Sequence, residues 1–185
     1  MSVENLKPIT ALRFFAAMWV VLFDVWPKLA GAVVPGVVAK GYLGVELFFI
    51  LSGFILCHVY LREVEAGRFR YGSFLWARLA RVYPLHLATL VAVGLMAVGA
   101  GLAGFSVQAS VLAWSSLPAN LLLLQAWGLA PQAGWNHPSW SISAEWFAYL
   151  AFPAFAFVAM KLSSRPWLAV AGAVLGMVGL YGLFQ

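Results

Sequence analysis

The stretch "LRFFAAMWVVLFDVW", residues 12–26, is apolar enough to belong to a membrane-spanning helix, yet it carries two charges. Arg13 lies near its start and Asp24 lies eleven residues later. Eleven residues make almost three turns of an α-helix, so both side chains should project from the same face, roughly 16 Å apart. That separation excludes a direct ion pair, and the helix is predicted to carry a cation near one end and an acid near the other.

Two interpretations of Asp24 are open. Ionisable residues within membrane spans are costly and mark functional sites by default, so one face of this helix is a candidate site that extends across the membrane. Alternatively, Asp24 forms a local ion pair with Lys28, which follows it by four residues and would lie near the outer interface.

The composition of the whole chain is that of a membrane protein. Of its 185 residues, 64% are hydrophobic and only 9% are charged, whereas a soluble domain carries about a quarter charged residues. The mean hydropathy is +0.92. We therefore predict an all-α fold, a polytopic transmembrane helix bundle that forms a single membrane domain over residues 1–185. About six spans are expected, at residues 9–27, 41–60, 82–103, 111–128, 139–160 and 166–184.

The basic residues predict how the chain crosses the membrane. The only strongly basic stretch, "REVEAGRFRYGSFLWARLARVYP" at residues 62–84, holds five arginines, and cytoplasmic loops are enriched in Lys and Arg. This favours a multi-pass protein with a cytoplasmic N-terminus. With six spans, Lys161 and Arg165 would lie outside. If the weak segment 111–128 is re-entrant instead, both residues move inside and the bias becomes stronger.

The net charge of +5 is attributed to this orientation signal and to membrane lipids, and no nucleic-acid partner is predicted. The single cysteine, Cys57, excludes an internal disulfide and a cysteine-based metal site. The three histidines lack the close spacing of a metal pair, so no metal is predicted. His58 and His86 lie near the ends of predicted spans and are assigned to the membrane interface, whereas His137 precedes a polar motif.

Glu46 is the second acid within a predicted span, in "GYLGVELFFILSGF" at residues 41–54. The glycines of this motif and Ser52 would allow a neighbouring helix to approach closely. Glu46 is either part of a functional site or a structural carboxylate that pairs with an arginine of another helix, for which Arg13 is a candidate.

Arg78 and Arg81 are three residues apart, so they share one face of a helix at the membrane surface. Two guanidinium groups in this arrangement can bind phosphate, because each can donate two parallel hydrogen bonds. The alternative is a plain orientation signal or contact with anionic lipid headgroups, which the spacing alone favours.

Ser141, Glu145 and Tyr149 recur every four residues and predict a polar stripe on an apolar helix. Such a stripe must face protein or a water-filled cavity. Whether it performs chemistry or only forms hydrogen bonds between helices is open.

Taken in order, these motifs resemble the bacterial acyltransferase-3 family of integral membrane O-acyltransferases. The resemblance is carried by "ITALRFFAAMWVVLFD", "GYLGVELFFILSGFIL", "FLWARLARVYPLHL" and "WSISAEWFAYLAFP", which begin at residues 9, 41, 74 and 140. Each motif is weak individually, but four of them in the family's order make a specific signal.

The resemblance implies a protein of the bacterial inner (plasma) membrane. It would move an acyl group, such as acetyl, from cytoplasmic acyl-CoA to a hydroxyl of an extracytoplasmic carbohydrate or other acceptor. Acyl-CoA would be a co-substrate, with no tightly bound cofactor. Arg78 and Arg81 would bind the acyl-CoA, and the catalytic candidates are Asp24, Arg13, Glu46 and Glu145.

Two departures from the family pattern stand out. The family has a histidine at the position of Asp24, where it would act as general base on the acceptor hydroxyl. Aspartate is a weaker base near neutral pH and has a shorter side chain. The family also has about ten spans, so this chain resembles the N-terminal half of a larger bundle. The alternative hypotheses are a catalytically inactive acyltransferase-like membrane protein and a half-transporter.

Overall fold

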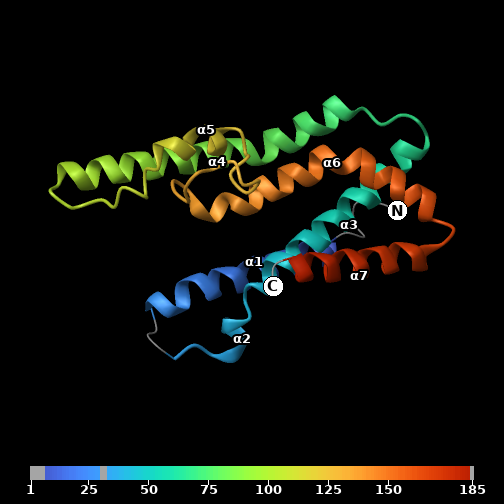
Figure 1. Ribbon diagram of the computed structural model, residues 1–185, viewed down its shortest axis with the longest axis horizontal. Helices are drawn as coiled ribbons and strands as arrows, with labels where there is room; N and C mark the ends of the chain where they lie inside the picture. The colour runs from blue at the N-terminus through green and yellow to red at the C-terminus, as the bar shows by residue number, and fades with distance from the viewer. Residues whose placement is uncertain (1–6, 30–32, 184–185) are drawn as a thin grey trace. The chain divides into compact units, whose positions relative to one another are not determined.

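The computed structural model describes residues 7–29 and 33–183. Within these ranges, all regular structure is helical (Figure 1), as expected of a chain whose backbone polar groups must be satisfied within each membrane-spanning segment. The chain divides into two compact units, residues 1–63 and 64–185, and each unit has its own internal packing.

Among the described residues, four helices are long and apolar enough to cross a membrane: α1 (Lys7–Leu29), α3 (Leu43–Glu65), α4 (Tyr71–Leu102) and α6 (Trp140–Leu162). A shorter apolar stretch, Pro166–Gly176, begins α7 (Pro166–Leu183). The predicted all-α fold class is confirmed for the described residues. The prediction of about six spans is not confirmed, because only four of these helices are long and apolar enough to cross a membrane.

Segment 111–128 does not form the span that its hydropathy predicts. It contains a single 3₁₀ turn, η2 (Trp114–Ser116), and the short helix α5 (Leu117–Leu121), followed by irregular chain. Leu123 has a φ of 58° and Gly128 a φ of 74°, and both values are incompatible with a continuing right-handed helix. The prediction of a transmembrane helix here is therefore wrong, and the re-entrant alternative stays a prediction.

Helix α4 begins at Tyr71, eleven residues before the predicted segment 82–103. Its 32 residues give it a length of about 48 Å. The basic residues in its first three turns made this part of the sequence resemble a loop. Arg78 and Arg81 consequently lie within a continuous helix, and His86 lies near the middle of α4 rather than at the end of a span.

In residues 1–63, small residues bring the start of α3 against α1. A Cβ atom on Gly44 would lie 2.6 Å from the Ala16 carbonyl oxygen, and one on Gly41 would lie 2.5 Å from the Phe23 Cβ. Only glycine can occupy these two positions without moving the backbone. The prediction of close helix approach by the glycines is confirmed at Gly41 and Gly44, whereas Gly53 has no neighbouring atom within 4 Å among the described residues.

In residues 64–185, α4 and α6 pack side by side through aromatic rings (Figure 1). Phe74 of α4 is 2% exposed and stacks on Phe152 with ring centroids 5.1 Å apart. The same ring meets Tyr149 edge-on at 6.0 Å. The Tyr71 hydroxyl donates a hydrogen bond of 2.9 Å to the Leu150 carbonyl, which fixes how the two helices align.

Phe74→Ala should destabilise this helix pair. In water-soluble cores Phe→Ala costs about 3–5 kcal/mol, but lipid tails are as apolar as side chains, so only the lost packing counts here. We expect a loss of about 2 kcal/mol, measured by thermal denaturation in detergent. Phe155→Ala is the control, because Phe155 is on α6 but 54% exposed. Equal losses in the two variants would contradict the packing role of Phe74.

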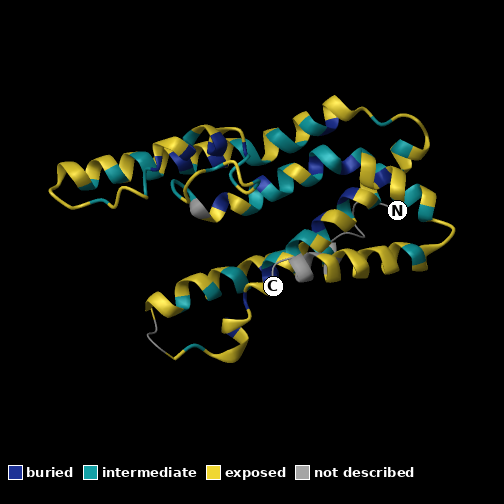
Figure 2. Ribbon diagram, viewed as in Figure 1, coloured by how far each residue is buried: buried dark blue, intermediate teal, exposed yellow. Residues whose placement is uncertain are grey.

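The long connection between α4 and α6 is held against both helices. Figure 2 shows that buried residues gather where α5, the middle of α4 and the start of α6 meet. Ser143, which is fully buried, accepts a hydrogen bond from the Ala126 amide at 3.1 Å and donates one to the Leu123 carbonyl at 2.7 Å. An otherwise irregular segment thereby takes up one defined conformation.

Candidate functional site

The predicted site residues fall into two groups, one in each unit. Arg13, Asp24 and Glu46 belong to residues 1–63. Arg78, Arg81 and Glu145 belong to residues 64–185. The structure therefore describes which residues meet within each group.

In the first unit, the Arg13 guanidinium lies over the Phe48 ring, 4.4 Å from its centroid. This is a cation–π contact between α1 and α3. Arg13 is half-buried, whereas the side chains of Asp24 and Glu46 are exposed. The local ion pair between Asp24 and Lys28 is not present among the described residues. An exposed carboxylate on a membrane helix is costly in lipid, so both acids require a protein or aqueous surrounding.

In the second unit, the two arginines and the polar stripe lie together. The Tyr149 hydroxyl of α6 donates a short hydrogen bond to the Glu145 carboxylate, one helical turn earlier. Arg78 and Arg81 follow Phe74 on α4 by four and seven residues, so both lie within about two helical turns of it. Arg78 also lies 5.9 Å from the centre of the Phe74 ring, which itself contacts Tyr149. Two motifs that are some 60 residues apart in the sequence thus form one cluster.

This α4–α6 cluster combines two guanidinium groups, one carboxylate and one phenol on an apolar helix pair. The carboxylate balances part of the arginine charge, and the remaining positive charge can attract an anion such as a phosphate. The hydrogen bond of Tyr149 stays within α6, so the interpretation of this stripe as an interhelical hydrogen-bond network is not what the structure shows. Ser141 takes no part, because its hydroxyl faces the Pro138 carbonyl at 3.4 Å.

Comparison with known sequences identifies the family. The chain matches the family model described as an acyltransferase domain, acyltransferase-3, over residues 7–185. It belongs to the acyltransferase-3 family.

Two curated proteins are similar to this acyltransferase-3 chain. It is 32% identical to the acyltransferase MdmB of Streptomyces mycarofaciens, over 95% of the chain and 46% of that protein. It is 50% identical to protein 2 in the picA locus of Rhizobium radiobacter, over 28% of the chain and 27% of that protein. The chain thus spans less than half the length of the curated relatives it matches. No solved structure matches it significantly.

Several polar residues of this acyltransferase-3 chain have structural roles that sequence reasoning missed. The sequence predicts that His86 lies at the membrane interface, near the end of a span. Instead, its side chain is 1% exposed, and its Nε2 lies 2.8 Å from the Asn120 carbonyl. The prediction is wrong because α4 starts eleven residues earlier than expected, which puts His86 near the middle of the helix. Asn136 donates a hydrogen bond of 2.8 Å to Thr89 on α4. The feature of the sequence that could have indicated these roles is the group of four amide side chains between residues 120 and 136. The side chain of His137 lies outside the described part of the structure.

Proposed function

We propose that this protein is an acyl-CoA-dependent membrane O-acyltransferase, or the part of one that binds the donor, acting on a hydroxyl of an extracytoplasmic carbohydrate. The observation that carries the proposal is the α4–α6 cluster in a member of an acyltransferase family. In it, Phe74 lies between Arg78 on α4 and the Glu145–Tyr149 pair on α6. The name of MdmB supports the transferase class.

Arg78 and Arg81 are the proposed donor-binding residues. Coenzyme A carries several phosphate oxygens, and guanidinium groups on one helix face can bind them in pairs. A lipid phosphate would be held in the same way, so binding of acyl-CoA must be distinguished from binding of anionic lipid. Glu145 and Tyr149 would then position and partly neutralise the two arginines.

The proposed reaction is direct attack of the acceptor hydroxyl on the thioester carbonyl. The oxygen–carbon bond forms, the carbon–sulfur bond breaks, and coenzyme A leaves as the thiolate, which takes up the proton removed from the acceptor hydroxyl. Asp24 is the proposed base that accepts the hydroxyl proton, in the position where the family has a histidine. Arg13, about 16 Å away along α1, would stabilise charge in another part of the site, and Glu46 would help to shape the site.

The proposed orientation follows from the observed helices. With α1, α3, α4 and α6 as spans and a cytoplasmic N-terminus, Lys161 and Arg165 fall inside together with Lys7 and the five arginines of residues 62–84. Only Lys28 and Lys40 fall outside, which is a strong positive-inside bias. The α4–α6 connection would then face the outside, where the acceptor is expected.

The test is acceptor-dependent release of coenzyme A by the purified protein in lipid nanodiscs. We expect Glu145→Gln to slow release about tenfold, because the amide leaves the arginine charges unbalanced. Glu63→Gln, an exposed acid outside the cluster, is the matched control and should change nothing. The proposal fails if acyl-CoA neither binds nor releases coenzyme A with any hydroxyl acceptor, or if both variants behave alike.

A second candidate is an acyltransferase-like protein without catalytic activity, which binds acyl-CoA or a partner. The residue that favours it is Asp24, which replaces the expected histidine. In that case acyl-CoA would bind without any release of coenzyme A. A half-transporter would instead move a solute across sealed vesicles without binding acyl-CoA.

A further inference from the structure

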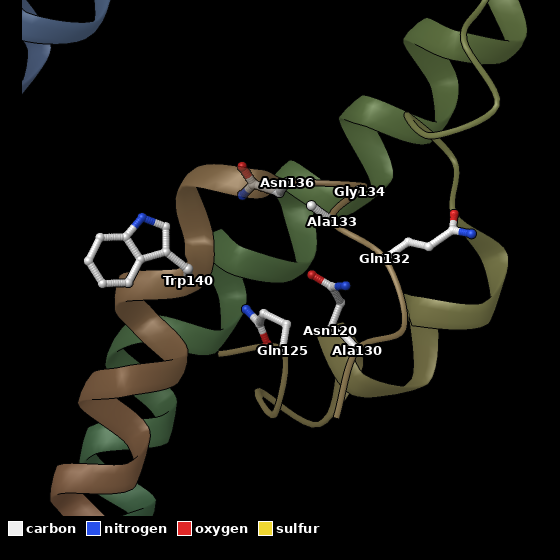
Figure 3. A pocket seen from close by; sticks show the side chains of 8 residues that line it. All are labelled: Asn120, Gln125, Ala130, Gln132, Ala133, Gly134, Asn136 and Trp140. Atoms are coloured by element: carbon white, nitrogen blue, oxygen red, sulfur yellow. The ribbon is translucent and has the colours of Figure 1, made fainter. Parts of the chain in front are cut away.

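A polar pocket of about 160 Å³ lies between the α4–α6 connection and the start of α6 (Figure 3). Four residues with carboxamide side chains dominate its wall, and Trp140 and small residues complete it. The lining residues are Asn120, Gln125, Ala130, Gln132, Ala133, Gly134, Asn136 and Trp140. We refer to this as the carboxamide pocket. All of it belongs to residues 64–185.

The carboxamide pocket is held in place by hydrogen bonds outside it. Asn120 is 2% exposed, and its amide donates a bond of 2.9 Å to the Ser116 carbonyl. The Gln125 amide donates to the carbonyl and the hydroxyl of Ser139, at 3.1 and 3.0 Å. Asn136 is held by Thr89, as described above. These contacts fix the orientation of three amide groups before any ligand enters.

One hydrogen-bond acceptor of the wall is left unsatisfied. The Gln125 Oε1 is buried and has no hydrogen-bond partner among the described residues. Because the nitrogen of the same amide already donates to Ser139, the amide cannot rotate without losing two hydrogen bonds. A buried acceptor without a partner is unfavourable, and a ligand hydroxyl that reached this oxygen would satisfy it.

The chemistry of the wall selects a neutral ligand with several hydroxyl groups. No Asp, Glu, Lys or Arg is among the lining residues, so a charged ligand would meet no opposite charge. Carboxamides both donate and accept hydrogen bonds, which matches the hydroxyl group. Trp140 is 43% exposed and lies at the edge of the pocket, where its ring points away from the amide side chains (Figure 3).

The position of the carboxamide pocket relates it to the α4–α6 cluster. Thr89, which holds the pocket residue Asn136, follows Arg81 by eight residues, or about 12 Å along α4. Trp140 precedes Glu145 by five residues, or about 8 Å along α6. The two helices thus carry Arg78, Arg81 and Glu145 toward one end and the carboxamide pocket toward the other.

We propose that the carboxamide pocket binds the acceptor of the acyl transfer as a neutral polyhydroxylated molecule, a sugar or a polyol. This proposal rests on the proposed function, because it takes the α4–α6 cluster as the donor site. It adds where the acceptor binds and which side chains recognise it. Gln125 and Gln132 contribute hydrogen bonds to hydroxyl groups.

Binding can be tested without acyl-CoA, by saturation-transfer NMR on the protein in nanodiscs. The probes are methyl glucoside, methyl rhamnoside and inositol, with glucose 6-phosphate as a charged comparison. We expect at least one neutral probe to bind, and Gln132→Leu to weaken its binding at least fivefold. The Gln132 side chain is exposed, and only its backbone bonds to Ser116, so this change should leave the fold intact.

The matched control is Gln108→Leu, the same change at an exposed glutamine of the same connection but outside the pocket wall. It should bind the neutral probe as the unmodified protein does. The pocket proposal is overturned if no neutral probe binds, if glucose 6-phosphate binds as tightly, or if the two Gln→Leu variants behave alike.

A kinetic measurement separates failure of this proposal from failure of the proposed function. If coenzyme A is released but Gln132→Leu leaves the KM for the acceptor unchanged, the pocket proposal alone is wrong. If the neutral probe binds in the pocket but no coenzyme A is released with any acceptor, the transferase proposal is wrong, and the pocket is a polyol site of another kind. The expected result is a fivefold or larger rise in acceptor KM with an unchanged KM for acyl-CoA.

Discussion

Replacing Arg78 and Arg81 together by alanine should weaken acyl-CoA binding at least about 100-fold. Each charge-assisted hydrogen bond to a phosphate contributes about 1.5–3 kcal/mol, and two such groups together exceed the 2.7 kcal/mol that corresponds to 100-fold. The measurement is equilibrium binding of acetyl-CoA to the protein in nanodiscs made without anionic lipid, which separates acyl-CoA from lipid phosphate. The rate of acyl transfer at low acyl-CoA concentration should fall by the same factor.

The control variant removes the same number of positive charges from a neighbouring part of the chain. Arg68→Ala with Arg70→Ala changes two exposed arginines just before α4, outside the α4–α6 cluster. This control variant should bind acetyl-CoA within about threefold of the unmodified protein, because exposed charges are screened by salt. Replacing Arg78 and Arg81 by lysine should restore the charge but only part of the affinity, because lysine cannot form paired hydrogen bonds. Equal losses in the two alanine double variants would show that only the net charge matters.

Asp24→Asn should slow acyl transfer about 100-fold or more while leaving acyl-CoA binding unchanged. General base catalysis contributes about 10²–10⁴-fold, and asparagine cannot accept the proton of the acceptor hydroxyl. The side chain of Asp24 is exposed on α1, so the nearly isosteric change should cost little stability. The rate is measured as coenzyme A release at saturating acyl-CoA.

Asp24→His and Glu65→Gln complete this experiment. The histidine restores the family residue and should keep or raise the rate, and Glu65→Gln neutralises an exposed acid at the end of α3 without effect. Activity in Asp24→His alone would show that the natural residue does not act as a base. Full activity in Asp24→Asn would remove position 24 from the proton transfer altogether.

The parts that the sequence predicted well depend on local periodicity. The grouping of Glu145 with Tyr149, and of Arg78 with Arg81, follows from helix geometry alone, and the structure places each pair on one helix. Their meeting across α4 and α6 was not predicted, because it depends on the packing of Phe74 between Tyr149 and Phe152. Hydropathy also located α1, α3 and α6, since each is a long apolar stretch bounded by polar or turn-forming residues.

The errors arose where local composition and tertiary packing disagree. Segment 111–128 is apolar, but its chain turns at Leu123 and is held by buried Ser143 rather than by a helical ladder. The start of α4 is basic, which is typical of a loop at the membrane surface, yet the chain is helical from Tyr71 onward. The carboxamide pocket has no linear motif, because its amides are brought together by side-chain bonds to Ser116, Ser139 and Thr89. Such contacts between separate segments cannot be deduced from spacing.

Because α4 is long, the thickness of the bilayer should affect how deep its functional residues lie in the membrane. A helix of about 48 Å exceeds the hydrocarbon core of about 30 Å, so α4 must tilt or extend into the headgroup region. Thinner or thicker membranes change that tilt and the depth of every residue on the helix. The arginines near its start and the carboxamide pocket beside its middle are fixed relative to each other by α4 and α6. Hydrophobic mismatch therefore moves both together, and the lipid determines how much water each of them meets.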